Sequence, residues 1–291
     1  MASCNSRITF LENIDPIYVI ERLKKLKKKK ILLIIISKSG ETTEVLSLYK
    51  IITIYFNSMI NFKSRALVIT EKQNSSLFRI CEEEEIKFIE HNPNIGGRFS
   101  CFSITGLLPA KLAGLNSNYI KKLSNLTFKE IINNNKYSFV DNLASLLCLN
   151  KTNKYKGHTV LSYQKSLISL MQWYRQLWGE SLGKNKNALH LMPALGSLDQ
   201  HSQLQMWLGG PNNILYTIII PRKREKDLWL RADKKKLIPY YLEKKSLGNI
   251  LNSMAFATYK ALVKAGRPVR LVYLDNSGLY PAVKLMSFLM L

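Results

Sequence analysis

Two side chains suited to acid–base chemistry, a carboxylate and an imidazole, occur near each other in the second half of the chain, as Glu180 and His201. Apolar residues at helical spacing from 167 to 178 predict a helix that ends near Glu180. A strand-like run, 188–192, then leads through a Pro-Ala-Leu-Gly turn to polar residues 199–202. Loop ends at one edge of a parallel sheet form ligand sites, so one pocket holding both side chains is predicted. The alternative is a solvated helix-end charge and a surface histidine.

A second group of polar residues follows a predicted buried strand in the first half. The leucine and β-branched run 31–36 is typical of a central parallel strand, and it leads into Ser-Lys-Ser-Gly-Glu-Thr-Thr at 37–43. Hydroxyls, one ammonium and backbone N–H groups at the start of a predicted helix, 41–55, favour phosphate as the ligand. The alternative is an ordinary helix N-cap, where Ser and Thr are also common.

An arginine preceded by two glycines, Gly96, Gly97 and Arg98, follows the predicted strands 66–70 and 86–90. Glycines let the backbone approach a ligand closely, and arginine presents a planar cation there. Taken alone, this pattern is more often a turn with a surface arginine.

These blocks together resemble the phosphoglucose isomerase family. WYRQLWGESLGK followed by DQHSQLQMWLGGP is similar to the signature region of bacterial glucose-6-phosphate isomerase, and GGRFSCFSITGLLPAKLAG resembles another block of that enzyme. The loop 37–43 is similar to the phosphate loop of sugar isomerase domains. The resemblance implies that the phosphate ligands are Ser37, Lys38, Ser39 and Thr42, and that Arg98 faces the reacting sugar carbons.

The resemblance also implies a reaction, the interconversion of glucose 6-phosphate and fructose 6-phosphate without a metal or an organic cofactor. Glu180 would move a proton between C2 and C1, and His201 would assist ring opening. In the family this histidine reaches in from the neighbouring subunit, which implies a homodimer. Arg98 and backbone N–H donors near Gly97 would stabilise the enediolate. A non-catalytic sugar-phosphate-binding or regulatory protein built from the same domains is the alternative.

The fold class predicted is α/β. Two strand–helix alternations agree with two sugar-isomerase-type domains, each a parallel sheet flanked by helices, at 1–150 and 151–291, with a linker at 150–157. Compared with the family, the first domain is expected to lack its initial strand and glycine/serine loop. The second is expected to lack its final helical segment, which carries a catalytic lysine that Lys284 does not match. Impaired activity is therefore an expectation.

Composition favours a globular protein with a positive field. The formal net charge is +23, but the lysines are scattered apart from two short runs, 27–30 and 234–236, so a nucleic-acid partner is not expected. Four cysteines lie far apart without metal-ligand spacing, and no apolar run approaches the length of a membrane span. We therefore expect reduced thiols, no membrane partner and a cytoplasmic location.

Overall fold

The computed structural model describes residues 8–290, except 28, 57–60, 134–140, 142–143, 146–147, 149–153, 185–187 and 232–236. The chain divides into two compact units, and the boundary along the sequence falls between Asn118 and Tyr119. We call them the first and the second unit. The sequence-based domain boundary between residues 150 and 151, and most of the predicted linker, lie outside the described residues, so that boundary stays a prediction.

The first unit is built on a three-stranded parallel sheet. Its strands are β1 (Leu33–Ile36), β2 (Ala66–Thr70) and β3 (Lys87–Glu90), and they lie in the order β1-β2-β3. Ile35 pairs with Val68, and Val68 pairs with Phe88. The three strands predicted from apolar runs are thus confirmed, with β1 and β3 beginning later than predicted. Apolar runs fill these strands because a parallel sheet is covered by helices.

Helices surround this first sheet, and two of them begin after a residue whose side chain caps the helix N-terminus. Asp15 caps α1, where its Oδ1 accepts from the Tyr18 N–H at 2.9 Å, and Ser75 caps α4 through the Phe78 N–H at 3.3 Å. The elements of this unit are α1 (Pro16–Leu26), α2 (Thr43–Phe56), α3 (Phe62–Arg65), α4 (Ser76–Glu83), the 3₁₀ helix η2 (Gly97–Phe102) and α5 (Ile104–Leu112). Side chains of α2 and α4 pack with those of β1 and β2 in one core, formed by Ile35, Tyr49, Ala66, Val68, Leu77, Cys81 and Ile86.

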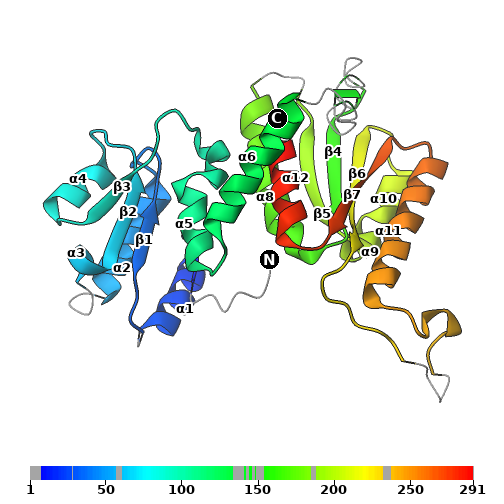
Figure 1. Ribbon diagram of the computed structural model, residues 1–291, viewed down its shortest axis with the longest axis horizontal. Coiled ribbons are helices and arrows are strands. Elements are labelled where there is room, and N and C mark those ends of the chain that lie inside the picture. The colour runs from blue at the N-terminus through cyan, green and yellow to red at the C-terminus, as the bar shows by residue number, and fades with distance from the viewer. Residues whose placement is uncertain are drawn as a thin grey trace. The chain divides into compact units, whose positions relative to one another are not determined.

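The second unit contains a four-stranded parallel sheet in the order β5-β4-β6-β7. Every pair of neighbouring strands is parallel, so each connection is a crossover that contains a helix. The elements are β4 (Gly157–Ser162), η4 (Lys165–Leu167), α8 (Ile168–Leu182), β5 (His190–Leu195), α9 (Leu198–Ser202), α10 (Leu204–Gly209), β6 (Ile214–Lys223), η5 (Tyr240–Leu242), α11 (Leu247–Lys264), β7 (Val269–Asn276) and α12 (Leu279–Leu289). Together with the first sheet, this confirms the predicted α/β class with two parallel sheets (Figure 1).

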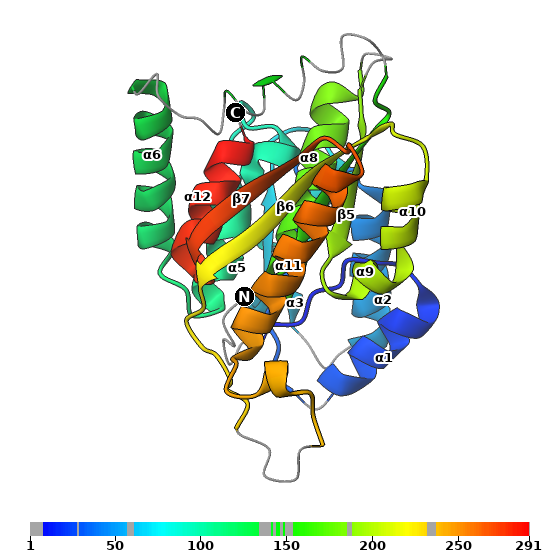
Figure 2. The ribbon, with the colours of Figure 1, turned by 90° about the vertical axis from the view of Figure 1, so that its right-hand side faces the viewer.

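Helices cover both faces of the second sheet. Tyr216, Ile218 and Ile220 of β6 pack in one core with Ala255 and Leu262 of α11. The intervening residues of β6 face the other side, where Thr217 and Ile219 lie with side chains of α8 and α12. Figure 2 shows α11 crossing one face of the sheet, and α12 beside β7. This double cover explains the nearly continuous apolar sequence of β6.

The sequence analysis did not predict α6 (Ser117–Asn133). The segment reads as polar because Asn and Lys occupy its exposed positions. Its buried residues, Ile120, Leu123, Ser124 and Thr127, nevertheless follow helical spacing. None of the helices that the structure describes is both long and apolar enough to cross a membrane.

Candidate active site

The loop at 37–43 leaves the carboxyl end of β1 and enters α2. The Ser37 hydroxyl lies at its centre, because it accepts from the Gly40 N–H at 3.2 Å and lies 2.8 Å from the Thr42 hydroxyl. Ser37 is buried, whereas Ser39 and Thr42 are exposed. Ser39 and Thr42 are therefore exposed residues whose hydroxyls also bond within the loop, the Thr42 hydroxyl to Ser37 and the Ser39 hydroxyl to the Glu41 N–H at 3.2 Å.

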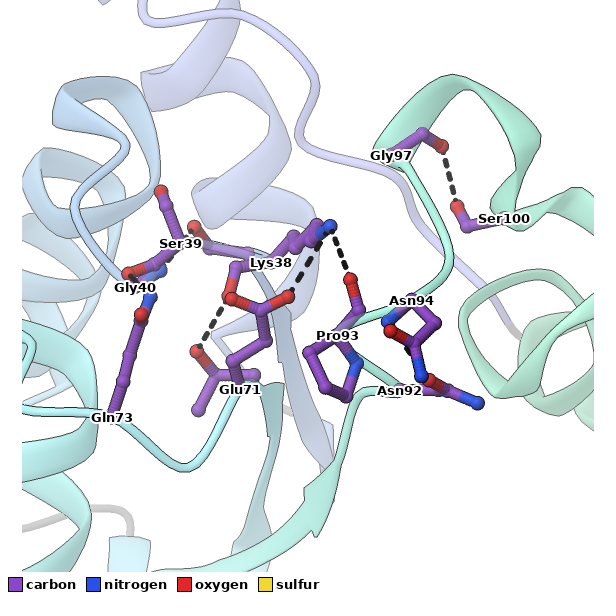
Figure 3. A network of polar contacts seen from close by, with 12 residues as sticks. Lys38, Ser39, Gly40, Glu71, Gln73, Asn92, Pro93, Asn94, Gly97 and Ser100 are labelled. Carbon is purple, nitrogen blue, oxygen red and sulfur yellow. Dashed lines mark hydrogen bonds and ion pairs between the residues drawn. The ribbon is translucent and has the colours of Figure 1, made fainter.

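Lys38 is tied to the loops that follow β2 and β3 (Figure 3). Its ammonium lies 3.3 Å from the Glu71 carboxylate and donates to the Pro93 carbonyl at 3.1 Å. Its own carbonyl accepts from the Glu71 N–H at 3.1 Å and from the Thr70 hydroxyl at 3.3 Å. Lys38 thus joins three neighbouring loops at the carboxyl edge of the sheet, where its positive charge lies beside the negative charge of Glu71.

Gly40 and Glu41 fix the loop against α4. Gly40 has φ +69°, and a Cβ added to it would lie 2.2 Å from the Ser75 Oγ, so both its conformation and its surroundings require glycine. The Glu41 carboxylate accepts from the Ser76 N–H at 2.6 Å, and this hydrogen bond lowers the pKa of Glu41. The only carboxylate of the loop is therefore engaged with the start of α4.

Arg98 follows β3 at the same carboxyl edge, in the 3₁₀ helix η2. Its guanidinium lies over the Phe99 ring, 4.8 Å from the ring centre, and is half-buried. The Ser100 hydroxyl donates to the Gly97 carbonyl at 2.7 Å, and space around the Gly97 Cα is open. The loop at 37–43 and the Gly97–Arg98 segment therefore belong to one edge of one sheet.

Glu180 is exposed in the last turn of α8. The buried face of this helix, which includes Tyr174, packs on the sheet, and the Trp178 indole N–H donates to the Leu189 carbonyl at 2.8 Å. This bond holds the end of α8 near the start of β5. The Gln176 amide donates to the Glu180 carboxylate at 2.9 Å. The sequence analysis missed Gln176, although its i,i+4 spacing from the glutamate was a signal.

His201 is exposed on the short helix α9, after the end of β5. Its neighbours are engaged in the fold: Asp199 accepts from the Leu195 N–H at 2.7 Å, and the Gln200 amide donates to the Thr258 hydroxyl at 2.7 Å. Gly196 is required in this turn, since a Cβ there would lie 2.5 Å from the Tyr163 ring. The polar residues 199–202 therefore serve mainly to orient α9.

The prediction that Glu180 and His201 of one chain share a pocket is wrong. A helix that connects two parallel strands runs antiparallel to them, so the end of α8 lies at the amino edge of the sheet. His201 follows β5 at the carboxyl edge. The six residues of β5 separate these edges by about 20 Å. The error arose because Glu180 and His201, which are close in sequence, were assumed to lie at the same edge of the sheet.

Other chemistry at these positions is limited. Within the described ranges, no group of three His, Cys, Asp or Glu side chains is arranged to hold a metal ion. Burial raises the pKa of the Cys101 thiol, near Arg98, to about 12, so this cysteine is protonated at neutral pH.

Glu71, which pairs with Lys38, was also missed by the sequence analysis. Its position directly after β2 was the available signal.

Comparison with known proteins agrees with this architecture. The phosphoglucose isomerase family model matches residues 1–194. The chain is 29% identical to a glucose-6-phosphate isomerase of Rubrobacter xylanophilus over 90% of its length, and 30% identical to that of Carboxydothermus hydrogenoformans over 96%. It spans 62% of the length of each of these two relatives.

Solved structures show the same fold. The crystal structure of a hypothetical protein from Thermus thermophilus superposes with a TM-score of 0.88 at 29% identity, covering 97% of this chain and 69% of that one. A glucose-6-phosphate isomerase from Chlamydia trachomatis gives 0.78 at 19% identity, covering 99% and 59%. Since the family model alone covers well over half of the sequence, the chain belongs to the phosphoglucose isomerase family.

Proposed function

We propose that this chain binds a sugar phosphate and interconverts glucose 6-phosphate and fructose 6-phosphate. The loop at 37–43 carries the proposal, because in a member of this family it presents the Ser39 and Thr42 hydroxyls and the Lys38 ammonium at the start of a helix. Hydroxyls and an ammonium at a helix N-terminus suit a phosphate dianion. Ser37 acts on the ligand through the loop that its hydroxyl orders.

The reaction follows from the remaining side chains. Glu180 takes the proton from C2 of the open-chain aldose and returns it to C1, and Gln176 orients its carboxylate. Arg98 and the Gly97 N–H stabilise the negative charge on the enediolate oxygens. His201 exchanges protons with the ring oxygen during opening. These steps conserve all atoms and need no oxidant.

Replacing the loop hydroxyls tests phosphate binding. We expect Ser39→Ala and Thr42→Ala each to weaken binding of fructose 6-phosphate by about 1.5–3 kcal/mol, the loss for a charge-assisted hydrogen bond. Titration calorimetry measures this change. Ser47→Ala, an exposed serine within α2, is the matched control. Equal affinity in all three variants would remove the loop from the site.

A homodimer is part of the proposal. Glu180 and His201 of one chain lie at opposite edges of a sheet, so a site that uses both draws them from two chains. We also propose a cytoplasmic location. The free thiols of Cys81, Cys101 and Cys148 support it, since reduced cysteines are typical of that compartment.

Subunit mixing tests the shared site. Glu180→Gln and His201→Gln homodimers should both be inactive, and a dimer that combines the two variants should contain one intact site. Random co-assembly would then restore about one quarter of the activity of the unmodified dimer, because half of the dimers are mixed and each has one intact site of two. A coupled assay of fructose 6-phosphate conversion after co-expression measures this. Activity that does not return on mixing would contradict shared sites.

A non-catalytic sugar-phosphate-binding or regulatory protein is the second candidate. It is favoured by the position of the phosphate loop and Arg98 at one edge of the first sheet, because binding there needs neither Glu180 nor His201. Phosphosugar binding in calorimetry, combined with no conversion in the coupled assay, would favour this candidate over the enzyme.

A further inference from the structure

The outer edge of β7 offers unpaired backbone groups. β7 is the last strand of its sheet and pairs only with β6 among the described elements (Figure 2). The Tyr216 N–H donates to the Pro268 carbonyl at 2.9 Å, which fixes the alternation of a parallel pair. Even-numbered residues of β7 therefore bond to β6. The N–H and C=O groups of Leu271, Tyr273 and Asp275 point outward, and no described residue bonds to them.

The opposite edge of the same sheet, β5, is closed by its sequence. The His190 N–H donates to the Lys156 carbonyl at 2.9 Å, so the odd-numbered residues of β5 face outward. One of these is Pro193, which has no N–H, and the Leu195 N–H is bonded to Asp199. Proline and capped groups of this kind protect strand edges from unwanted pairing. β7 has no proline. The β5 edge is thus protected from pairing with a further strand, whereas the β7 edge is not.

A cavity of about 350 Å³ lies along the β7 edge. Six consecutive residues of β7, from Arg270 to Asp275, line it. Because consecutive side chains of a strand point to opposite faces, only a cavity that follows the backbone edge touches all six. The other wall is one face of α12, formed by Pro281, Lys284, Leu285 and Phe288. The cavity therefore has a main-chain wall and a largely apolar wall.

The charges around this cavity are mainly positive. Arg270 and Lys284 line it, and Arg222 lies over the Tyr273 ring at 4.5 Å. The Lys284 ammonium also lies 3.6 Å from the Glu130 carboxylate, and the Arg270 Nε donates to the Thr217 hydroxyl at 2.9 Å. Asp275 is the acidic residue of the lining. The chain itself has a formal net charge of +23, so a second copy would meet electrostatic repulsion here. An acidic occupant fits these charges.

We propose that the β7 edge binds an extended, acidic segment of a partner polypeptide, which adds a fifth strand to the second sheet. The outward groups of Leu271, Tyr273 and Asp275 would hold its backbone, and alternate side chains would lie against α12. Acidic side chains of the segment would meet Lys284 and Arg270. This binding is independent of the proposed sugar-phosphate chemistry.

A synthetic peptide tests the proposal. The probe is an end-blocked peptide of alternating valine and glutamate, with eight residues to match the length of β7. We expect calorimetry to detect binding to the full chain. Tyr273→Pro removes an outward N–H, whereas Tyr273→Ala removes the same ring and keeps the N–H. The proline variant should bind about ten-fold more weakly than the alanine variant, as expected when main-chain hydrogen bonds are lost.

Two further measurements identify the mode of binding. In hydrogen exchange, the probe should slow exchange of the Leu271, Tyr273 and Asp275 amides, and a probe with lysine in place of glutamate should not. Thermal unfolding of both Tyr273 variants checks that each is folded. The proposal is overturned by absent binding, by equal affinity of the two variants, or by a self-associated chain whose dimer is lost in Tyr273→Pro, since that result would identify a second copy as the occupant.

Discussion

Glu180→Gln should lower kcat for the conversion of fructose 6-phosphate by about 10²–10⁴-fold, the usual contribution of a general base. The amide keeps the shape of the side chain but cannot accept a proton. Glu180 is exposed and its partner, the Gln176 amide, can still donate to an amide oxygen, so folding should be unchanged. Binding of the sugar phosphate, measured by calorimetry, should also persist, because the loop that we propose to bind the phosphate, 37–43, belongs to the first unit.

Two comparisons make this result specific. Glu21→Gln makes the same change on the exposed face of α1 and should leave kcat unchanged. Exchange of the C2 proton with solvent, followed by NMR, reports the proton transfer itself and should fall in parallel with kcat. If turnover survives Glu180→Gln undiminished, Glu180 is not the base.

The second large effect concerns stability and pH, through the buried His158. Its Nε2 lies 2.8 Å from the Thr217 hydroxyl, and its ring packs edge-on against Trp178. Burial, assisted by the charge of Arg270, lowers the pKa of His158 to about 3. Arg270 and Tyr174 are the ionisable groups that line the same small cavity. The histidine therefore stays neutral in the folded protein and takes up a proton only on unfolding.

This difference predicts acid sensitivity below the ordinary histidine pKa of 6.5. Above it, both states are neutral and the free energy of unfolding is unaffected by His158. Below pH 6.5, His158 is protonated in the unfolded chain but stays neutral in the folded chain. It therefore lowers the free energy of unfolding by about 1.4 kcal/mol for each pH unit. Between pH 7 and pH 5 we expect a loss of about 2 kcal/mol from this residue.

Urea unfolding at both pH values measures the effect as a difference between proteins. His158→Gln removes the titrating group and should reduce the pH dependence by that amount. His190→Gln, an exposed histidine of β5, is the control and should follow the unmodified chain. Equal pH dependence of all three proteins would contradict the assignment. Carboxylates that titrate in the same range affect all three alike.

Much of the fold was predictable because its physical causes are local. Buried parallel strands need long apolar runs, and β2 was therefore predicted at its observed position. α6 was missed because its exposed Asn and Lys residues outweighed a regular buried face. The observed first residues of β1 and β3 lie one or two positions after the predicted ones. The limits of a strand depend on its pairing partners, which a sequence pattern does not contain.

The candidate site was predictable in its composition and less so in its arrangement. The loop at 37–43 follows a strand directly, so its place at the sheet edge followed from the strand. The relation of Glu180 to His201 depended on the direction of α8, which residue spacing does not reveal. The open edge of β7 was likewise hidden, because it follows from which backbone groups β6 already uses.

The bonds that Ser37, Lys38 and Glu41 make have a thermodynamic consequence for any ligand of the loop. Their partners come from the loop itself and from residues that follow β2 and β3, so the loop is ordered as the sheet forms. Its conformational entropy is therefore lost during folding and not during binding. An incoming phosphate would therefore immobilise little more than itself, and less of its interaction free energy would be spent on ordering the protein.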